Sequence, residues 1–311
     1  MRNCFAVTLV IGLMTTIAAA QTPAELEMIK AACPAAAPAK PEKPRQVLVF
    51  TLTRGFRHDS IPFGVAAMKA LGEKSGAFTV THSEDAAVFE KATLEKFDAV
   101  ILLNTTGELF RPADWEKLPS DKIGPAIEIE KRLKQNLTEF VESGKGLVGI
   151  HSATDTFYQF AWFGEAIGGY FDGHPWNAGD DVVIRVDDPG HPVAKPLEGG
   201  PLEFKEEIYQ LREPYARDKQ RVLLTLDDIK TNLQKGGVKR TDGDFGVSWV
   251  RTQGKGRVFY CSLGHNAHIY LNPRVLGHYL AGIQFAIGDL AADTTPLPKA
   301  KAPASQPVNK P

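Results

Sequence analysis

Short apolar segments alternate with segments of helical periodicity through the first half of the chain. Residues 46–53 and 98–104 are mostly apolar, which is typical of strands buried on both faces of a parallel sheet. Ser60 can cap a helix over 60–74 that has its apolar residues on one face. The same patterns predict further strands at 78–82 and 146–151, and further helices at 127–143 and 158–167.

The second half of the chain is richer in strands than the first. Strands and helices alternate through the first half of the chain, and this alternation predicts an α/β fold with a doubly wound, mostly parallel sheet flanked by helices. The later strands are expected as additions to that sheet. In such folds ligands bind beyond the carboxyl ends of the strands, so the residues after each strand are the candidates for function. The later strands are expected at 182–186, 208–211, 222–226, 246–251 and 258–262, and the last helix at 273–287.

The two ends of the chain depart from this pattern. Residues 1–20 combine a basic start, a short apolar core and an Ala-rich end, which predicts a signal peptide cleaved before Gln21. We therefore expect a secreted or periplasmic protein with no transmembrane anchor after cleavage. The Pro/Ala-rich residues 21–44 predict a linker or docked arm with little regular structure, and 291–311 predict a disordered tail. The folded domain is expected at 45–290.

Composition and charge narrow the classes of function. Lys and Arg total 36 and Asp and Glu total 37 among the 311 residues, so the formal net charge is −1. A chain with this balance has no basic surface of the kind that binds nucleic acid. Three cysteines are too few for a disulfide framework. The surroundings of Cys33 and Cys261 predict one exposed and one buried thiol.

Histidines gather in the loops that follow predicted strands. The chain has eight histidines, and five of them lie in Gly-rich loops expected at or near one edge of the sheet. These five are His58, His151, His174, His265 and His268. The clustering predicts a shared polar site, although two or three of these residues could instead be structural hydrogen-bonding groups in turns. His191 is expected to be a turn residue, and His82 and His278 ordinary strand-end and helix residues.

Two chemistries stay open for these histidines. Neutral imidazoles are common zinc ligands, so His58, His151 and His265 are candidate ligands for a divalent metal such as zinc. Without a metal, the same side chains would act as general acid and base near neutral pH. An oxygen ligand could come from one of the acidic residues Glu206, Glu207, Asp155 and Asp172.

Several familiar motifs are absent or misplaced. Residues 144–149 match G-x-G-x-x-G by letter, but they precede a predicted strand, whereas a dinucleotide-binding loop follows one. The chain has no phosphate-binding G-x-x-x-x-G-K-[ST] loop and no G-x-S-x-G nucleophile elbow. Near the histidine loops, Trp162 and Trp176 are candidates for stacking on a sugar ring, and packing in the core is an equal alternative for each.

The loop motifs together resemble the ThuA-like, or trehalose-utilisation, family. The resemblance runs in family order from about residue 45 to residue 289. The motifs that carry it are RGFRHDS at 54–60, GLVGIHSATDT at 146–156, GGYFDGH at 168–174, DPGHP at 188–192, EEIY at 206–209 and GKGRVFY at 254–260, followed by Gly264 and His265.

This resemblance implies a fold similar to that of the class I glutamine amidotransferases, which is a flavodoxin-like arrangement. In that fold a Cys nucleophile sits on the sharp turn after a central strand. The equivalent turn of this chain offers His151 or Ser152 and no Cys. Glutamine hydrolysis through a thiolate is therefore not expected, and only the fold carries over.

The resemblance also implies carbohydrate use, in pathways that oxidise glycosides to 3-keto sugars. A lyase, hydrolase or isomerase acting on such sugars needs a base, an acid and a group that polarises the ketone. On this hypothesis His151 is the base or a metal ligand, and His58 and His265 are acids or ligands. Glu207 is expected to orient them. The small-molecule carbohydrate would be held by the remaining candidates, which are Arg57, Asn104, Asp155, Trp162, His174 and Trp176.

Two other functions remain compatible with the sequence. One is a non-catalytic carbohydrate-binding module of the bacterial envelope, in which Trp162 or Trp176 rather than the histidines would hold the sugar. The other is a hydrolase of unmodified glycosides, which needs two carboxylates at a suitable separation. A homo-oligomer also stays open, because the Pro/Ala-rich arm could dock on a second subunit.

Overall fold

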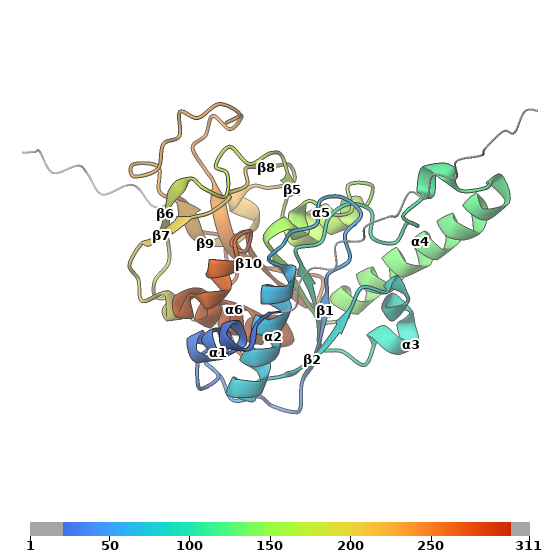
Figure 1. The fold of residues 1–311 in the computed structure, drawn as a ribbon, viewed down its shortest axis with the longest axis horizontal. Helices are drawn as coiled ribbons and strands as arrows, with labels where there is room; N and C mark the ends of the chain where they lie inside the picture. The colour runs from blue at the N-terminus through green and yellow to red at the C-terminus, as the bar shows by residue number, and fades with distance from the viewer. Residues whose placement is uncertain (1–20, 300–311) are drawn as a thin grey trace, which may run out of the picture.

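The computed structural model describes residues 21–299, and its central feature is a nine-stranded sheet (Figure 1). Five neighbouring strands in the order β2-β1-β3-β4-β11 are all parallel to one another. Their carboxyl ends therefore meet at one edge of the sheet. The five strands are β1 (Gln46–Phe50), β2 (Thr79–Ser83), β3 (Ala99–Leu103), β4 (Gly146–Ile150) and β11 (Gly256–Cys261).

The sheet continues beyond β11 with four antiparallel strands, in the order β10-β9-β6-β7. These are β6 (Asp181–Val186), β7 (Leu202–Lys205), β9 (Arg221–Leu226) and β10 (Gly246–Gln253). The predicted doubly wound α/β fold with extra strands in its second half is thereby confirmed. The strand predicted at 208–211 differs, because only β8 (Leu211–Arg212) forms there and pairs with β5 (Tyr170–Phe171) in a separate small sheet.

Helices cover both faces of the sheet. In β1, Val47 and Val49 pack into one hydrophobic cluster while Leu48 and Phe50 pack into the other, as the alternation of a strand requires. The first cluster lies under α1, α2 and α6, and the second under α3, α4 and α5. The helices are α1 (Pro23–Ala32), α2 (Ile61–Ser75), α3 (Lys91–Leu94), α4 (Ser120–Glu142), α5 (Ala161–Ile167) and α6 (Pro273–Ile287).

Six short 3₁₀ helices complete the regular structure of the described residues. They are η1 (Ala86–Phe89), η2 (Trp115–Lys117), η3 (His151–Thr154), η4 (Lys195–Leu197), η5 (Arg217–Lys219) and η6 (Ala267–Leu271). The helix α4 begins seven residues before the predicted start at 127. Its first turns project beyond the rest of the protein (Figure 1).

The N-terminal arm contains a helix, which corrects the expectation of little regular structure there. Thr22 and Glu25 form a reciprocal capping box at the start of α1, and Pro23 occupies its first turn. Ile29 is buried, and the Lys74 ammonium of α2 donates to the carbonyl of Cys33 at 2.6 Å. The arm is thus docked on α2. Cys33 is buried together with the arm, and Cys261 is buried as well. The prediction of one exposed thiol was therefore wrong.

The start of the predicted tail is also held against the domain. Asp293 Oδ2 lies 3.2 Å from the Arg221 guanidinium, and Lys299 Nζ lies 2.6 Å from Asp228 Oδ2. The predicted signal peptide and residues 300–311 lie outside the described residues, so those predictions stay predictions. Within residues 21–299, no helix combines the length and apolar composition that a membrane crossing requires.

Candidate metal centre

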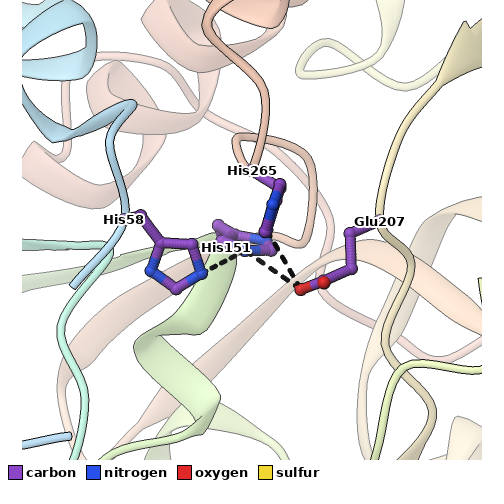
Figure 2. Close-up of side chains that lie close together, drawn as sticks. All are labelled: His58, His151, Glu207 and His265. Carbon is purple, nitrogen blue, oxygen red and sulfur yellow. Dashed lines mark hydrogen bonds and ion pairs between the residues drawn. The ribbon is translucent and has the colours of Figure 1, made fainter. Parts of the chain in front are cut away.

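Three of the predicted histidines and one glutamate converge beyond the carboxyl ends of the parallel strands (Figure 2). His58 follows β1, His151 follows β4 and His265 follows β11. Glu207 comes from the segment after β7 and reaches the cluster from the side of the antiparallel strands. We call these four residues the His/Glu cluster. Its position at the strand ends agrees with the rule for ligand sites in α/β sheets.

His151 is fixed in one orientation at the centre of the cluster. Its backbone φ is 51°, which is the left-handed region that a non-glycine residue seldom adopts. Its Nδ1 lies 2.8 Å from the carbonyl oxygen of Ser262, which can only accept a hydrogen bond. Nδ1 therefore carries the proton, and Nε2 of the neutral ring presents a lone pair to the cluster. Burial, reinforced by His58, holds the pKa of His151 well below its ordinary value.

The ring of His58 faces that lone pair. Its Nε2 lies 3.1 Å from Nε2 of His151, and its Nδ1 lies 3.5 Å from the Ser152 hydroxyl. Burial lowers the pKa of His58 to about 4, and repulsion by His265 acts in the same direction. Both rings are therefore neutral near pH 7, which is the form that binds a metal ion.

Glu207 and His265 supply the remaining donor atoms. Glu207 Oε1 lies 3.2 Å from His265 Nδ1 and 3.6 Å from His151 Nε2. Burial by itself lowers the pKa of His265, but the adjacent Glu207 carboxylate outweighs it and raises the value. Although Oε1 is near, His265 Nδ1 is buried and has no hydrogen bond of acceptable geometry among the described residues.

The spacing of these atoms fits a metal ion. One ligand atom from each of the four residues can be chosen so that all lie within 4.8 Å of one another. Ligand atoms about 2.0–2.1 Å from a tetrahedral zinc ion lie about 3.3 Å apart. The contacts between His58 and His151, between His265 and Glu207, and between His151 and Glu207 span 3.1–3.6 Å. Three imidazoles and one carboxylate are a donor set that zinc accepts.

Glu206, next to Glu207 in the chain, holds one ligand in place. Its carboxylate accepts from the backbone amides of Gly264 at 2.9 Å, His265 at 2.7 Å and Asn266 at 3.1 Å. Burial raises the pKa of Glu206 to about 7, although these three hydrogen bonds act to lower it. The two adjacent glutamates thus have separate roles, because one fixes the backbone of the loop and the other faces its histidine.

Three further polar residues border the cluster. His174 is 43% exposed in its side chain, and its Nδ1 lies 3.3 Å from Glu207 Oε2. The Tyr209 hydroxyl lies 3.4 Å from His151 Nε2. Asp155 accepts a 2.5 Å hydrogen bond from the Tyr158 hydroxyl, and its pKa is raised chiefly by burial. The predicted site residue His174 therefore contacts the cluster, and Asp155 follows His151 by four residues, near enough for the charge of Glu207 to add to the rise in its pKa.

The two candidate tryptophans do not lie beside the His/Glu cluster. Trp176 is 1% exposed, and its indole N–H donates to the Asn232 carbonyl, so it packs in the core and the prediction of a sugar contact there is corrected. The Trp162 indole N–H donates to Glu142 Oε1 at 2.7 Å. Glu142 ends α4 just before β4 begins, so Trp162 lies toward the opposite edge of the sheet from the cluster. Trp162 is half-buried against the second hydrophobic cluster, and a sugar contact there stays a prediction.

Arg57 and Asn104 also have other partners. Arg57 forms an ion pair with Glu84 at 2.8 Å, and the structure gives it no contact with the cluster. The Asn104 side-chain amide donates to Ser60 Oγ at 3.0 Å and to the Gly264 carbonyl at 3.1 Å. Its oxygen accepts from Tyr270. Because its hydrogen-bonding groups are occupied, Asn104 joins the loops that carry His58 and His265 rather than holding a substrate. His268 is exposed and outside the cluster.

Sequence reasoning missed Tyr209, Ser262 and the anchoring role of Glu206. A signal for Tyr209 exists, since residues two apart in an extended segment share a side, and Tyr209 is two residues after Glu207. No such local signal exists for Ser262, because its carbonyl matters only through the pairing of β11 beside β4.

Comparisons with known proteins agree with this architecture. Residues 46–121 and 124–286 match the sequence model of the family described as ThuA, trehalose utilisation. A protein described as ThuA-like from Bacteroides uniformis is 21% identical with a TM-score of 0.59, over 79% of this chain and 93% of that one. Another from Parabacteroides merdae is 20% identical with a TM-score of 0.52, over 79% and 91%. These identities support similarity of fold alone. No curated protein gives a significant match.

Proposed function

Because the chain belongs to the ThuA, or trehalose-utilisation, family, we propose that it is a carbohydrate-active enzyme with a divalent metal in the His/Glu cluster. The substrates we propose are 3-keto glycosides or disaccharides. The observation that carries this proposal is the spacing of the donor atoms. Three histidines and a glutamate place one donor atom each within 4.8 Å of the others, and three of these contacts have the 3.1–3.6 Å separation of ligands on one zinc ion.

The residues around the cluster suit elimination from such a sugar. A 3-keto group acidifies the C–H bond at C2, so a base can take that proton while the C1–O glycosidic bond breaks and the leaving oxygen gains a proton. A bound divalent ion would supply Lewis acidity toward the ketone oxygen. The half-exposed His174 and the Asp155 carboxylate border the cluster and can take up and return the protons.

The alternative of a non-catalytic binding module loses its main support. That alternative rested on Trp162 or Trp176 as a platform for the sugar. Neither indole lies beside the cluster, and Trp176 is enclosed in the core. A two-carboxylate glycoside hydrolase is also less suited to this site, since the Glu206 carboxylate is occupied by three backbone amides.

Metal analysis tests the proposal directly. We expect about one equivalent of a transition metal per chain of the purified protein, measured by inductively coupled plasma mass spectrometry. His151→Ala should lose the metal and all turnover of a 3-keto glycoside while keeping its circular dichroism spectrum. His268→Ala is the matched control, because that histidine is exposed and outside the cluster, and it should keep both. Wild-type protein that binds no zinc even when zinc is added would contradict the proposal.

A further inference from the structure

An aromatic ring stands exposed beside the His/Glu cluster. Phe56 is 65% exposed, and it is the aromatic member of the large exposed apolar side chains among the described residues. Its ring centroid lies 4.8 Å from that of His58, with the two rings nearly perpendicular. A single exposed apolar residue is ordinary on a protein surface. Phe56 differs from such residues in two ways. It lies beside His58 of the cluster, and hydrogen bonds hold its loop in place.

The loop that carries Phe56 is tied to the end of β3. The Arg54 amide donates to the Thr106 carbonyl at 2.7 Å, and the Gly55 amide donates to the Thr106 hydroxyl at 3.1 Å. That hydroxyl in turn donates to the Phe56 carbonyl at 2.8 Å. Three hydrogen bonds to one residue fix the backbone at Phe56, so a ligand stacking on the ring would order little more than its side-chain torsions.

Neither arginine that flanks Phe56 is free to hold a ligand there. Arg54 Nε donates to the Arg111 carbonyl, and Arg57 pairs with Glu84. The ion pairs of Glu207 are all with histidines. A ligand beside Phe56 therefore meets an aromatic face rather than a free guanidinium.

The other border of the cluster offers hydrogen-bond acceptors. Asp155 is half-buried, and the Tyr158 hydroxyl engages its Oδ1. Its second oxygen makes no hydrogen bond or ion pair to the described residues, so it is available to a ligand hydroxyl. A ligand suited to this site has one apolar face and several hydroxyl groups.

We propose that Phe56 is the platform on which a pyranose ring stacks when it binds over the His/Glu cluster, with Asp155 accepting from its hydroxyls. This inference rests on the proposed function for the chemistry of the cluster. It adds the residue that recognises the sugar ring, and it replaces the two tryptophans as the aromatic contact.

Binding to zinc-loaded full-length protein tests the platform. The probes are trehalose and methyl α-D-glucopyranoside, both measured by isothermal titration calorimetry. We expect Phe56→Ala to weaken binding of the neutral sugars by about tenfold or more, since an aromatic contact contributes about 1 kcal/mol beyond buried area. Phe56→Tyr should stay within about threefold of wild type. Ile229→Ala is the matched control, since Ile229 is also 65% exposed but lies in the loop after β9.

The outcomes separate this inference from the proposed function. Metal content is measured on each variant and should not change in Phe56→Ala. Wild-type affinity in Phe56→Ala, or failure of any neutral sugar to bind the wild type, would each overturn the platform. Sugar binding that depends on Phe56 in a protein that takes up no metal would support the platform and overturn the metal centre.

Discussion

Two hydrogen bonds from one strand hold His151 in its unusual backbone conformation. A non-glycine residue at a φ of 51° carries a cost of about 1–3 kcal/mol. The Tyr260 hydroxyl, from β11, donates to the His151 carbonyl at 2.7 Å, and Ser262 just beyond β11 accepts from its ring. Backbone and imidazole are therefore fixed together, and the lone pair of Nε2 points toward the cluster. Strain of this kind is typical of residues whose orientation matters for function.

Glu206 gives a prediction at the scale of the single residue. Glu206→Gln leaves one oxygen to accept from three backbone amides and turns an NH₂ group toward one of them. The loop carrying His265 should lose its fixed position, and zinc affinity should fall by about 10–100-fold while the fold persists. Competition titration with a chelator measures the affinity. Glu203→Gln, on the exposed face of β7, should leave it unchanged. Equal affinity in the two variants would show that the loop needs no such anchor.

The helix α1 gives a prediction at the scale of the element. Ile29 is 1% exposed and packs into the cluster of apolar side chains under α2. Ile29→Ala should reduce the free energy of unfolding by about 2–4 kcal/mol, because it removes buried carbon and leaves a cavity. Urea denaturation measures the loss. Met28→Ala is the control on the same helix, since Met28 is 54% exposed, and it should cost less than about 0.5 kcal/mol. Equal losses would mean that the arm is not docked in solution.

Local sequence patterns predict the elements of the parallel sheet better than those at its margins. The apolar run of β1 is readable because both faces of that strand are buried. The start of α1 carries a readable T-x-x-E capping box at Thr22, but the prolines that follow the helix obscured it. The strand β7 gives a weaker pattern, because the alternation of apolar and charged residues in Leu202–Lys205 spans only four residues and the strand pairs only with β6 at the edge of the sheet. Its short, half-exposed sequence becomes a strand through that pairing.

Buried His278 gives a prediction for the stability of the whole molecule. Its Nδ1 donates to the Val193 carbonyl at 2.8 Å, and burial lowers its pKa from 6.5 to about 4. Between these values the unfolded chain binds a proton that the folded chain does not. The contribution of His278 to the free energy of unfolding is therefore complete above pH 6.5. It is lost as the pH drops toward 4, which lowers the free energy of unfolding by about 3 kcal/mol.

Urea denaturation at pH 7 and pH 4.5 in a metal chelator measures this dependence. His278→Gln removes the titrating group, so the difference in free energy between the two pH values should shrink. His268→Gln changes an exposed histidine whose pKa burial lowers less than that of His278, so it should retain most of the wild-type difference. A His278→Gln variant with the full wild-type difference would mean that the pH dependence arises at other groups.

The sequence predicts where the candidate site lies better than it predicts which residues contact one another within it. Parallel strands bring their carboxyl ends to one edge, so the loops carrying His58, His151 and His265 were expected to meet. The separation of Glu206 and Glu207 into an anchor and a ligand depends on contacts with a loop nearly sixty residues away, such as that of Glu206 with His265. No local pattern encodes such a contact. The burial of Trp176 likewise follows from its bridge to Ile208.

The position of β11 makes folding of the sheet depend on a segment synthesised long after its neighbour. This strand lies between β4 and β10 in the middle of the sheet, yet β4 ends at Ile150 and β11 begins only at Gly256. Until the ribosome has released residues 256–261, β4 presents an unpaired edge of backbone amides and carbonyls. Such an edge is a template for pairing with another chain. A nascent or truncated chain should therefore need a chaperone, and completion of the sheet and alignment of His151 by Ser262 should occur in the same late step.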